Sequence, residues 1–204
     1  TPRFSPDYKS IVYVSYIERR ARVYVYDIAS GRQRLVTESP NQTFSPRWSP
    51  DGKSILYSMS VGGNTDLYRV SAAGGGTPVR LTNTPAIETG GSYSPDGSKI
   101  VFESDRSGSQ QIYVMNADGS GQTRLTNNPG SNEIMPAVSR VDNRIAFASG
   151  RDGNFEIYVM NADGTSPTNL TNNPAGDFWP VWSPDGGKIA FISARDEGAE
   201  IYVI

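Results

Sequence analysis

Five copies of one short motif, spaced at nearly constant intervals, constrain the fold of this 204-residue chain more than any other feature. The motif is Ser-Pro-Asp, and the fourth copy keeps only its serine. The serines stand 44, 45, 45 and 44 residues apart, at Ser5, Ser49, Ser94, Ser139 and Ser183. A second marker, an aliphatic residue before tyrosine, keeps the same interval, at Tyr24, Tyr68, Tyr113, Tyr158 and Tyr202. This periodicity predicts repeated units that bury their apolar faces against their neighbours.

Each repeat has the pattern of four short strands separated by turns. In the second repeat, residues 46–49, 54–58, 66–70 and 79–82 alternate with segments rich in Gly, Pro and Asp. Asp118-Gly119 and Asp163-Gly164 are strong hairpin signals in the next two repeats. No window shows helical periodicity. The sequence therefore predicts an all-β fold, a five-bladed β-propeller of four-stranded antiparallel blades.

The repeats are predicted to form one domain, residues 1–204, with units at approximately 1–44, 45–89, 90–134, 135–178 and 179–204. The fifth unit supplies only three strands, so we expect the last blade to lack its outermost strand. The segment from Glu200 to Ile204 would then be an exposed edge, through which the chain could self-associate. We also expect Trp182 and its neighbours to close the ring against the first blade.

The composition excludes several classes of function. The chain has no His and no Cys, which excludes a Ser-His-Asp relay, a histidine general base and thiolate chemistry. It also argues against a metal site of the usual zinc type, and no cofactor is implied. The net charge of −2 gives no electrostatic case for nucleic acid, and no apolar run is long enough for membrane insertion.

The third repeat, residues 94–128, resembles the TolB-type (WD40-like) propeller repeat. Its Ser-Pro-Asp-Gly turn, Lys-Ile-Val-Phe strand, Ser-Asp-Arg-Ser-Gly segment, Ile-Tyr-Val-Met-Asn-Ala-Asp-Gly hairpin and Leu-Thr-Asn ending carry the resemblance, which extends over essentially the whole chain. The resemblance implies a periplasmic scaffold that docks a lipoprotein partner near its channel. The resemblance would imply six blades and an N-terminal α/β domain, whereas the sequence here shows five repeats.

Four equivalent positions at the entry to the innermost strands are the first candidate site: Thr43, Glu88, Glu133 and Asp177. We expect them to ring one mouth of the central channel, where three carboxylates would bind a cation, a basic peptide or a sugar. The structural alternative is that they pair with the arginines at the end of the second strand, Arg106, Arg151 and Arg195.

Two basic residues are the second candidate site. Arg3 and Arg47 come one residue before a bulky apolar position of the first strand, and we expect them to point into the channel beside the first two blades. Their side chains would bind an anion there, or would simply be solvated.

The favoured function is a non-catalytic scaffold that binds a protein or peptide partner at the channel mouth or a blade edge. One alternative is a carbohydrate-active enzyme that uses Glu88, Glu133 and Asp177 in the central funnel. Their equivalent contexts argue against it, because an acid and a base need unlike environments. A second alternative is an engineered assembly without natural function, since the third and fourth repeats share long identical segments.

Overall fold

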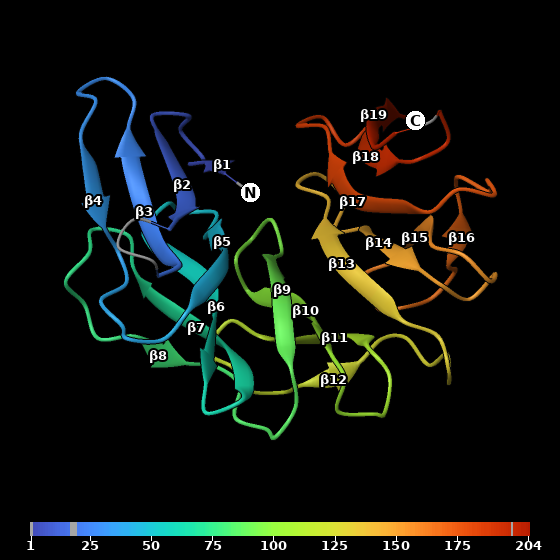
Figure 1. The fold of residues 1–204 in the computed structure, drawn as a ribbon, viewed down its shortest axis with the longest axis horizontal. Coiled ribbons are helices and arrows are strands. Elements are labelled where there is room, and N and C mark those ends of the chain that lie inside the picture. The colour runs from blue at the N-terminus through green and yellow to red at the C-terminus, as the bar shows by residue number, and fades with distance from the viewer. Residues whose placement is uncertain (1, 17–19, 197) are drawn as a thin grey trace.

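The computed structural model describes residues 2–16, 20–196 and 198–204, and in these residues nineteen strands form five antiparallel sheets. The sheets are arranged as five blades around a common centre (Figure 1), where their innermost strands line a central channel. The predicted five-bladed propeller is therefore confirmed, as is the three-stranded last blade. The described segments contain no helix, and so no helix long and apolar enough to cross a membrane.

The strands follow one another from the channel outward in every blade. Blade 1 comprises β1 (Arg3–Phe4), β2 (Ser10–Ser15), β3 (Arg22–Asp27) and β4 (Gln33–Leu35). Blade 2 comprises β5 (Thr43–Trp48), β6 (Ser54–Val61), β7 (Asn64–Ser71) and β8 (Val79–Arg80). Blade 3 comprises β9 (Glu88–Tyr93), β10 (Lys99–Ser104), β11 (Gln111–Asn116) and β12 (Thr123–Arg124). Blade 4 comprises β13 (Glu133–Val138), β14 (Ile145–Ser149), β15 (Glu156–Met160) and β16 (Thr168–Asn169). Blade 5 comprises β17 (Asp177–Trp182), β18 (Ile189–Ser193) and β19 (Glu200–Val203).

The Ser-Pro-Asp motif forms the turn between the first two strands of a blade. In blade 3, the hydroxyl of Ser94 donates to the carboxylate of Asp96 at 2.5 Å and accepts from the backbone N–H of Lys99 at 2.9 Å. Gly97 takes a φ of 72°, a backbone conformation that glycine adopts without a steric penalty. The motif is therefore a self-contained turn that joins the channel-lining strand to the next one.

Neighbouring blades are held together by apolar residues from both of their facing sheets. Between blades 3 and 4, for example, Val101 and Ile112 pack against Ile145 and Phe147. Equivalent clusters join blades 1 and 2, blades 2 and 3, and blades 4 and 5. Among the described residues, no such cluster joins blade 5 to blade 1.

The expectation that Trp182 closes the ring against blade 1 is wrong. Trp182 packs in the cluster between blades 4 and 5, and its indole N–H donates to the carbonyl of Ala137 in blade 4 at 3.0 Å. The equivalent Trp48 likewise donates to the carbonyl of Arg3, in blade 1. This position therefore contacts the preceding blade in blades 2 to 5, whereas its counterpart Phe4 in blade 1 remains 51% exposed.

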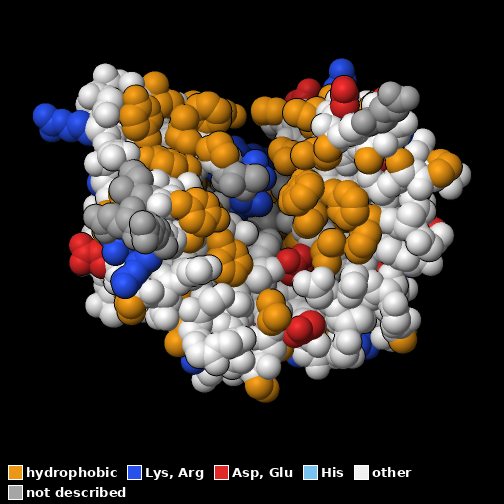
Figure 2. All heavy atoms as spheres, viewed as in Figure 1, with side chains coloured by type: hydrophobic (Ala, Val, Ile, Leu, Met, Phe, Trp, Pro, Cys, Tyr) orange, Lys and Arg blue, Asp and Glu red, His pale blue; other side chains and the backbone are white. Residues whose placement is uncertain are grey.

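Blades 1 and 5 lie on either side of an opening next to the N-terminus (Figure 1). The space-filling view shows hydrophobic side chains along both sides of this opening (Figure 2). On blade 5, the edge strand β19 exposes Ile201 and Val203, and Ile204 follows it. The five blades thus form an arc rather than a sealed ring.

Candidate binding site in the central channel

The innermost strands of all five blades line one cavity of about 560 Å³ at the centre of the molecule. Arg3 comes from β1, Arg47 from β5, Ser92 from β9, Ala137 from β13 and Val181 from β17, all at equivalent positions of their repeats. A cavity of this volume lies in the range typical of ligand sites. At this one position, the five repeats therefore present different side chains to the same cavity.

Each complete innermost strand has a local backbone irregularity that shapes the cavity wall. The register of β5, β9, β13 and β17 with the second strand shifts in its middle. One residue at the shift takes a positive φ in every case: Ser45, Gly90, Met135 and Trp179. A bulge of this kind bends a strand and redirects its side chains. Trp179 is 51% exposed at this point, and it lines the cavity.

Three arginines line the cavity together. Arg3 and Arg47 lie there as the sequence predicts, and Arg140, which follows β13 of blade 4, lines the same cavity. The space-filling view shows Lys and Arg side chains deep in the hollow between the blades (Figure 2). Among the described residues, no carboxylate lies within ion-pair distance of any of the three. Binding of an anion by Arg3 and Arg47 stays a prediction.

Burial and like charge both disfavour the charged state of the arginine cluster. Burial, together with the charge of Arg3, lowers the pKa of Arg47 to about 9. Burial also lowers the pKa of Arg3, with a second contribution from the charge of Arg140. One guanidinium N–H of Arg47 donates to the carbonyl of Pro46 at 3.1 Å. At neutral pH the cluster holds like charges that are partly removed from water.

Sequence reasoning missed two residues that shape this cavity. Arg140 stands where the other repeats have the proline of Ser-Pro-Asp, so the single break in the motif was the available signal. Glu103 also lines the cavity. Its carboxylate accepts hydrogen bonds from the hydroxyl of Thr89 and from the backbone N–H of Met135. The equivalent positions carry Val14, Ser58, Ala148 and Ile192, so a charge at this position of the second strand was the signal for Glu103.

The acidic candidate residues lie elsewhere, inside the blades. Glu88, Glu133 and Asp177 are fully buried, and each forms an ion pair with the arginine of its own blade. The N–O distances are 2.6 Å for Arg106–Glu88, 2.9 Å for Arg151–Glu133 and 3.1 Å for Arg195–Asp177. These ion pairs are the contacts that the structural alternative predicts, in which each carboxylate pairs with the arginine at the end of the second strand. A ligand-binding role for the three carboxylates stays a prediction.

Thr43 fills the corresponding position of blade 2 without a charge. Its hydroxyl donates to the carbonyl of Ala21 at 3.1 Å and lies 3.2 Å from the hydroxyl of Thr37. Thr43 is fully buried, like its acidic counterparts. A ligand-binding role for Thr43 likewise stays a prediction.

The partner arginines also stack on the paired aromatic residues of their blades. The guanidinium of Arg151 lies 4.3 Å from the ring centroid of Tyr158, which pairs across the strands with Phe147. Arg106 and Arg195 make the same contact with Tyr113 and Tyr202. A cation placed over an aromatic face is stabilised by the ring quadrupole. The arginine two residues after the last serine of the second strand therefore joins the buried carboxylate to the aromatic pair in each of these three blades.

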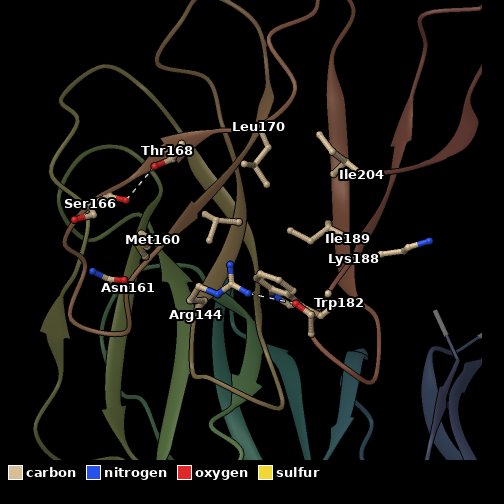
Figure 3. Close-up of a pocket in the computed structure, with 13 residues that line it drawn as sticks. Arg144, Met160, Asn161, Ser166, Thr168, Leu170, Trp182, Lys188, Ile189 and Ile204 are labelled. Atoms are coloured by element: carbon tan, nitrogen blue, oxygen red, sulfur yellow. Dashed lines mark hydrogen bonds between the residues drawn. The ribbon is translucent and has the colours of Figure 1, made fainter.

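A second cavity of about 530 Å³ lies between blades 4 and 5, away from the channel (Figure 3). Leu170 and Ile204 face it, and the guanidinium of Arg144 reaches across toward Trp182 (Figure 3). In the two preceding interfaces, a hairpin turn packs closely at this place. A Cβ added to Gly119 would lie 2.5 Å from the carbonyl oxygen of Leu81, and one added to Gly164 would lie 2.6 Å from that of Leu125. The cavity between blades 4 and 5 is therefore a feature of how these two blades pack, and it is separate from the channel.

The whole chain matches a known family. The profile of the TolB β-propeller domain matches residues 1–140 and 126–204. This chain belongs to the TolB β-propeller family.

Among the described residues, no group of three or more acidic side chains is placed to hold a metal ion.

Curated relatives match over parts of their length. The Tol-Pal system protein TolB of Gluconobacter oxydans is 39% identical over 73 residues, which are 36% of this chain and 16% of that protein. The TolB of Dinoroseobacter shibae is 46% identical over 90 residues, 43% of this chain and 20% of the relative. The matched segments thus span a fifth or less of these relatives.

Solved structures extend the likeness to the full chain. The putative TolB of Agrobacterium tumefaciens superposes with a TM-score of 0.87 at 27% identity, covering 100% of this chain and 76% of that one. TolB from Acinetobacter baumannii gives 0.88 at 28% identity, covering 100% and 51%. An oligogalacturonate lyase is similar at 17% identity and a TM-score of 0.71, a likeness of fold alone.

Proposed function

We propose that this chain is a non-catalytic scaffold of a Tol-Pal type system, which binds a protein or peptide partner at the mouth of the central channel in the periplasm. Membership of the TolB β-propeller family supports the scaffold role and the compartment. The observation that supports the binding site is the cavity lined by all five innermost strands. It combines exposed aromatic side chains with arginines that have no carboxylate partner in the described part of the chain.

The rim of this cavity has the composition of a protein-binding surface. Phe4, Tyr8 and Trp179 line it, and each exposes about half of its side chain. Aromatic residues and arginine are enriched at the energetic centres of protein interfaces, because they bury a large area and form directional contacts. Exposed aromatic side chains that converge on a cavity are costly to leave in water, so a partner that covers them gains affinity.

The burial of the repeated carboxylates supports a binding role over a glycosidase. A glycosidase needs two carboxyl groups that touch the scissile bond. Glu88, Glu133 and Asp177 are fully buried and engaged by arginines, so a sugar in the channel would not touch their oxygens.

The test is capture of a partner from periplasmic extract of one of the bacteria named above, with the protein immobilised and bound proteins identified by mass spectrometry. Three baits are compared: the wild type, the double variant Tyr8→Ala plus Trp179→Ala, and Val79→Ala. Val79 is an exposed apolar residue on the outermost strand of blade 2, and so it is a control far from the channel.

We expect a protein that the wild type and Val79→Ala retain and that the double variant loses. Retention by all three baits would place the partner outside the channel. Capture of nothing by the wild type would contradict the scaffold role. Circular dichroism of each bait checks that its fold is intact.

A further inference from the structure

The arginines of the channel point to the chemistry of the partner. Arg3, Arg47 and Arg140 come from blades 1, 2 and 4, and they line one cavity from different sides. Their sequence positions are about 45 and 90 residues apart, so only the curvature of the propeller brings them together. Three cations gathered on one concave surface form a binding site for negative charge.

The charge of this cluster is not balanced within the described part of the protein. The one carboxylate that lines the cavity, Glu103, uses its two oxygens to accept from Thr89 and from the backbone of Met135. In contrast, Arg106, Arg151 and Arg195 each have a buried carboxylate partner. The same molecule thus pairs its structural arginines and leaves the channel arginines without an anion.

The electrostatic state of the cluster favours the binding of an anion. Burial and mutual repulsion lower the pKa values of Arg3 and Arg47, so both guanidinium groups are held in an unfavourable charged state. An anion placed among them would remove the repulsion and would accept charge-assisted hydrogen bonds, which are stronger than neutral ones.

We infer that Arg3, Arg47 and Arg140 bind a carboxylate group of an acidic peptide segment, while the aromatic rim of Phe4, Tyr8 and Trp179 covers the adjoining residues of that peptide. This inference rests on the proposed function and specifies the partner of the same site. The combination favours a peptide over a small inorganic anion, because the rim offers apolar area that phosphate would not use. The carboxylate is that of an Asp or Glu side chain or that of a chain terminus.

Isothermal titration calorimetry with short synthetic peptides tests this chemistry and separates the two sources. A tetraglutamate with both termini blocked offers side-chain carboxylates only. A tetraglutamine with a free C-terminus offers the terminal carboxylate only, and a fully blocked tetraglutamine offers neither. Inorganic phosphate is titrated as a simple anion. We expect one or both carboxylate peptides to bind, and to bind more weakly as salt is added, whereas the blocked tetraglutamine does not bind.

Variants of single arginines connect the binding to the channel. Arg140→Pro removes one charge and restores the residue that the other four repeats carry, so the turn should fold normally. Arg47→Gln removes a second charge. Arg124→Gln is the matched control, because Arg124 is exposed on the outermost strand of blade 3. We expect Arg140→Pro and Arg47→Gln each to weaken peptide binding about tenfold, the loss of a charge-assisted hydrogen bond, and Arg124→Gln to leave it unchanged.

Each other outcome overturns the inference. Equal binding by the wild type and Arg140→Pro would exclude the cluster, and equal weakening by Arg124→Gln would indicate unspecific charge attraction. Binding of phosphate without either carboxylate peptide would exclude the peptide, and no binding would exclude the site. If the peptides fail while capture of a partner still depends on Tyr8 and Trp179, the scaffold stands and only the carboxylate chemistry is wrong. If Arg47→Gln does not fold, Arg140→Pro decides.

Discussion

Nearly the same residues lie in opposite environments at the closed interfaces among blades 3, 4 and 5 and at the open side between blades 5 and 1. Ile112 and Ile157, on the third strands of blades 3 and 4, are both completely buried. Ile201 has the equivalent place in blade 5, where it pairs with Ile192 across the strands, yet it is 77% exposed. The residue type is identical, so the neighbouring blade alone decides whether the side chain is buried.

This difference separates two kinds of stabilisation in the molecule. Hydrogen-bonded turns, ion pairs and aromatic pairs form within one blade and are found next to the open side as well as in the middle. Apolar burial requires the next blade and is lost on the open side. In a repeat protein, intrinsic stability of the unit and the interface between units are separate terms.

The largest expected effect tests the terms within a blade. Glu133→Ala in blade 4 and Asp177→Ala in blade 5 each remove a fully buried carboxylate and leave a partly buried arginine without its partner, at a cost of about 3 to 5 kcal/mol in the free energy of unfolding. Because both pairs are internal to a blade, the two losses should be similar despite the open side. Denaturant-induced unfolding followed by circular dichroism measures both. A much smaller loss for Asp177→Ala would show that the ion pair, too, depends on the neighbouring blade.

The second prediction makes one chemical change on the two sides of the comparison. Ile157→Ala removes a fully buried side chain and should lower the free energy of unfolding by about 2 to 5 kcal/mol. Ile201→Ala removes an exposed one and should change it by less than about 0.5 kcal/mol. The same unfolding experiment compares them. A large loss for Ile201→Ala would mean that the open side is covered in solution, for example by another copy of the chain.

The third prediction concerns the edge strand β19. Its apolar residues and unpaired backbone groups offer a template for another strand, whereas lysine on an edge strand prevents such pairing. We expect the double variant Ile201→Lys plus Val203→Lys to shift self-association toward the monomer in sedimentation velocity, with little change in melting temperature. As a control, Val79→Lys alters an exposed apolar residue on the edge of blade 2. A wild type that is monomeric at all concentrations would reject self-association through this edge.

The smallest expected effect comes from the Ser-Pro-Asp turns. The hydroxyl of Ser94 and backbone N–H of Ser98 lower the pKa of Asp96 to about 2. Because the folded-state pKa is below the ordinary value of 3.8, the turn stabilises the fold above that pH, and the contribution is lost as the pH falls toward about 2. The hydroxyl of Ser183 lowers the pKa of Asp185 beside the open side in the same way.

Melting curves between about pH 4 and pH 2 check this prediction. Asp96→Asn and Asp185→Asn should both flatten the acid dependence to a similar extent, because the hydrogen bonds lie within each turn. A flattening by Asp96→Asn alone would tie the turn to the presence of a neighbouring blade.

Local features of this fold could be predicted from the sequence, and relations between repeats could not. The turn at Ser94-Pro95-Asp96 makes its own hydrogen bonds, so its sequence indicates its structure. The pairing of Glu133 with Arg151 could be weighed beforehand for the same reason, since both lie in one blade. The prediction that Trp182 faces blade 1 was wrong, because periodicity identifies equivalent positions without indicating which neighbouring blade they contact.

The residues of the channel also show that contacts between repeats are harder to predict than contacts within one repeat. The positions of Arg3 and Arg47 in the cavity followed from the repeat, because they belong to equivalent strands. Arg140 joins them from a turn three repeats after Arg3, and this proximity depends on the curvature of the whole arc. A residue that breaks the repeat motif is therefore the best sequence indicator of a site formed between repeats.

The arc has ends, and this determines how the molecule should come apart. Each apolar cluster connects one blade to the next, so blades 2, 3 and 4 are held from two sides and blades 1 and 5 from one. A linear array of this kind frays from its ends, whereas a closed circle must lose two contacts at once to release any member. Amide hydrogens of β10 and β14 should therefore exchange slowest and those of β2 and β18 faster, and unfolding should begin on both sides of the opening between blades 5 and 1.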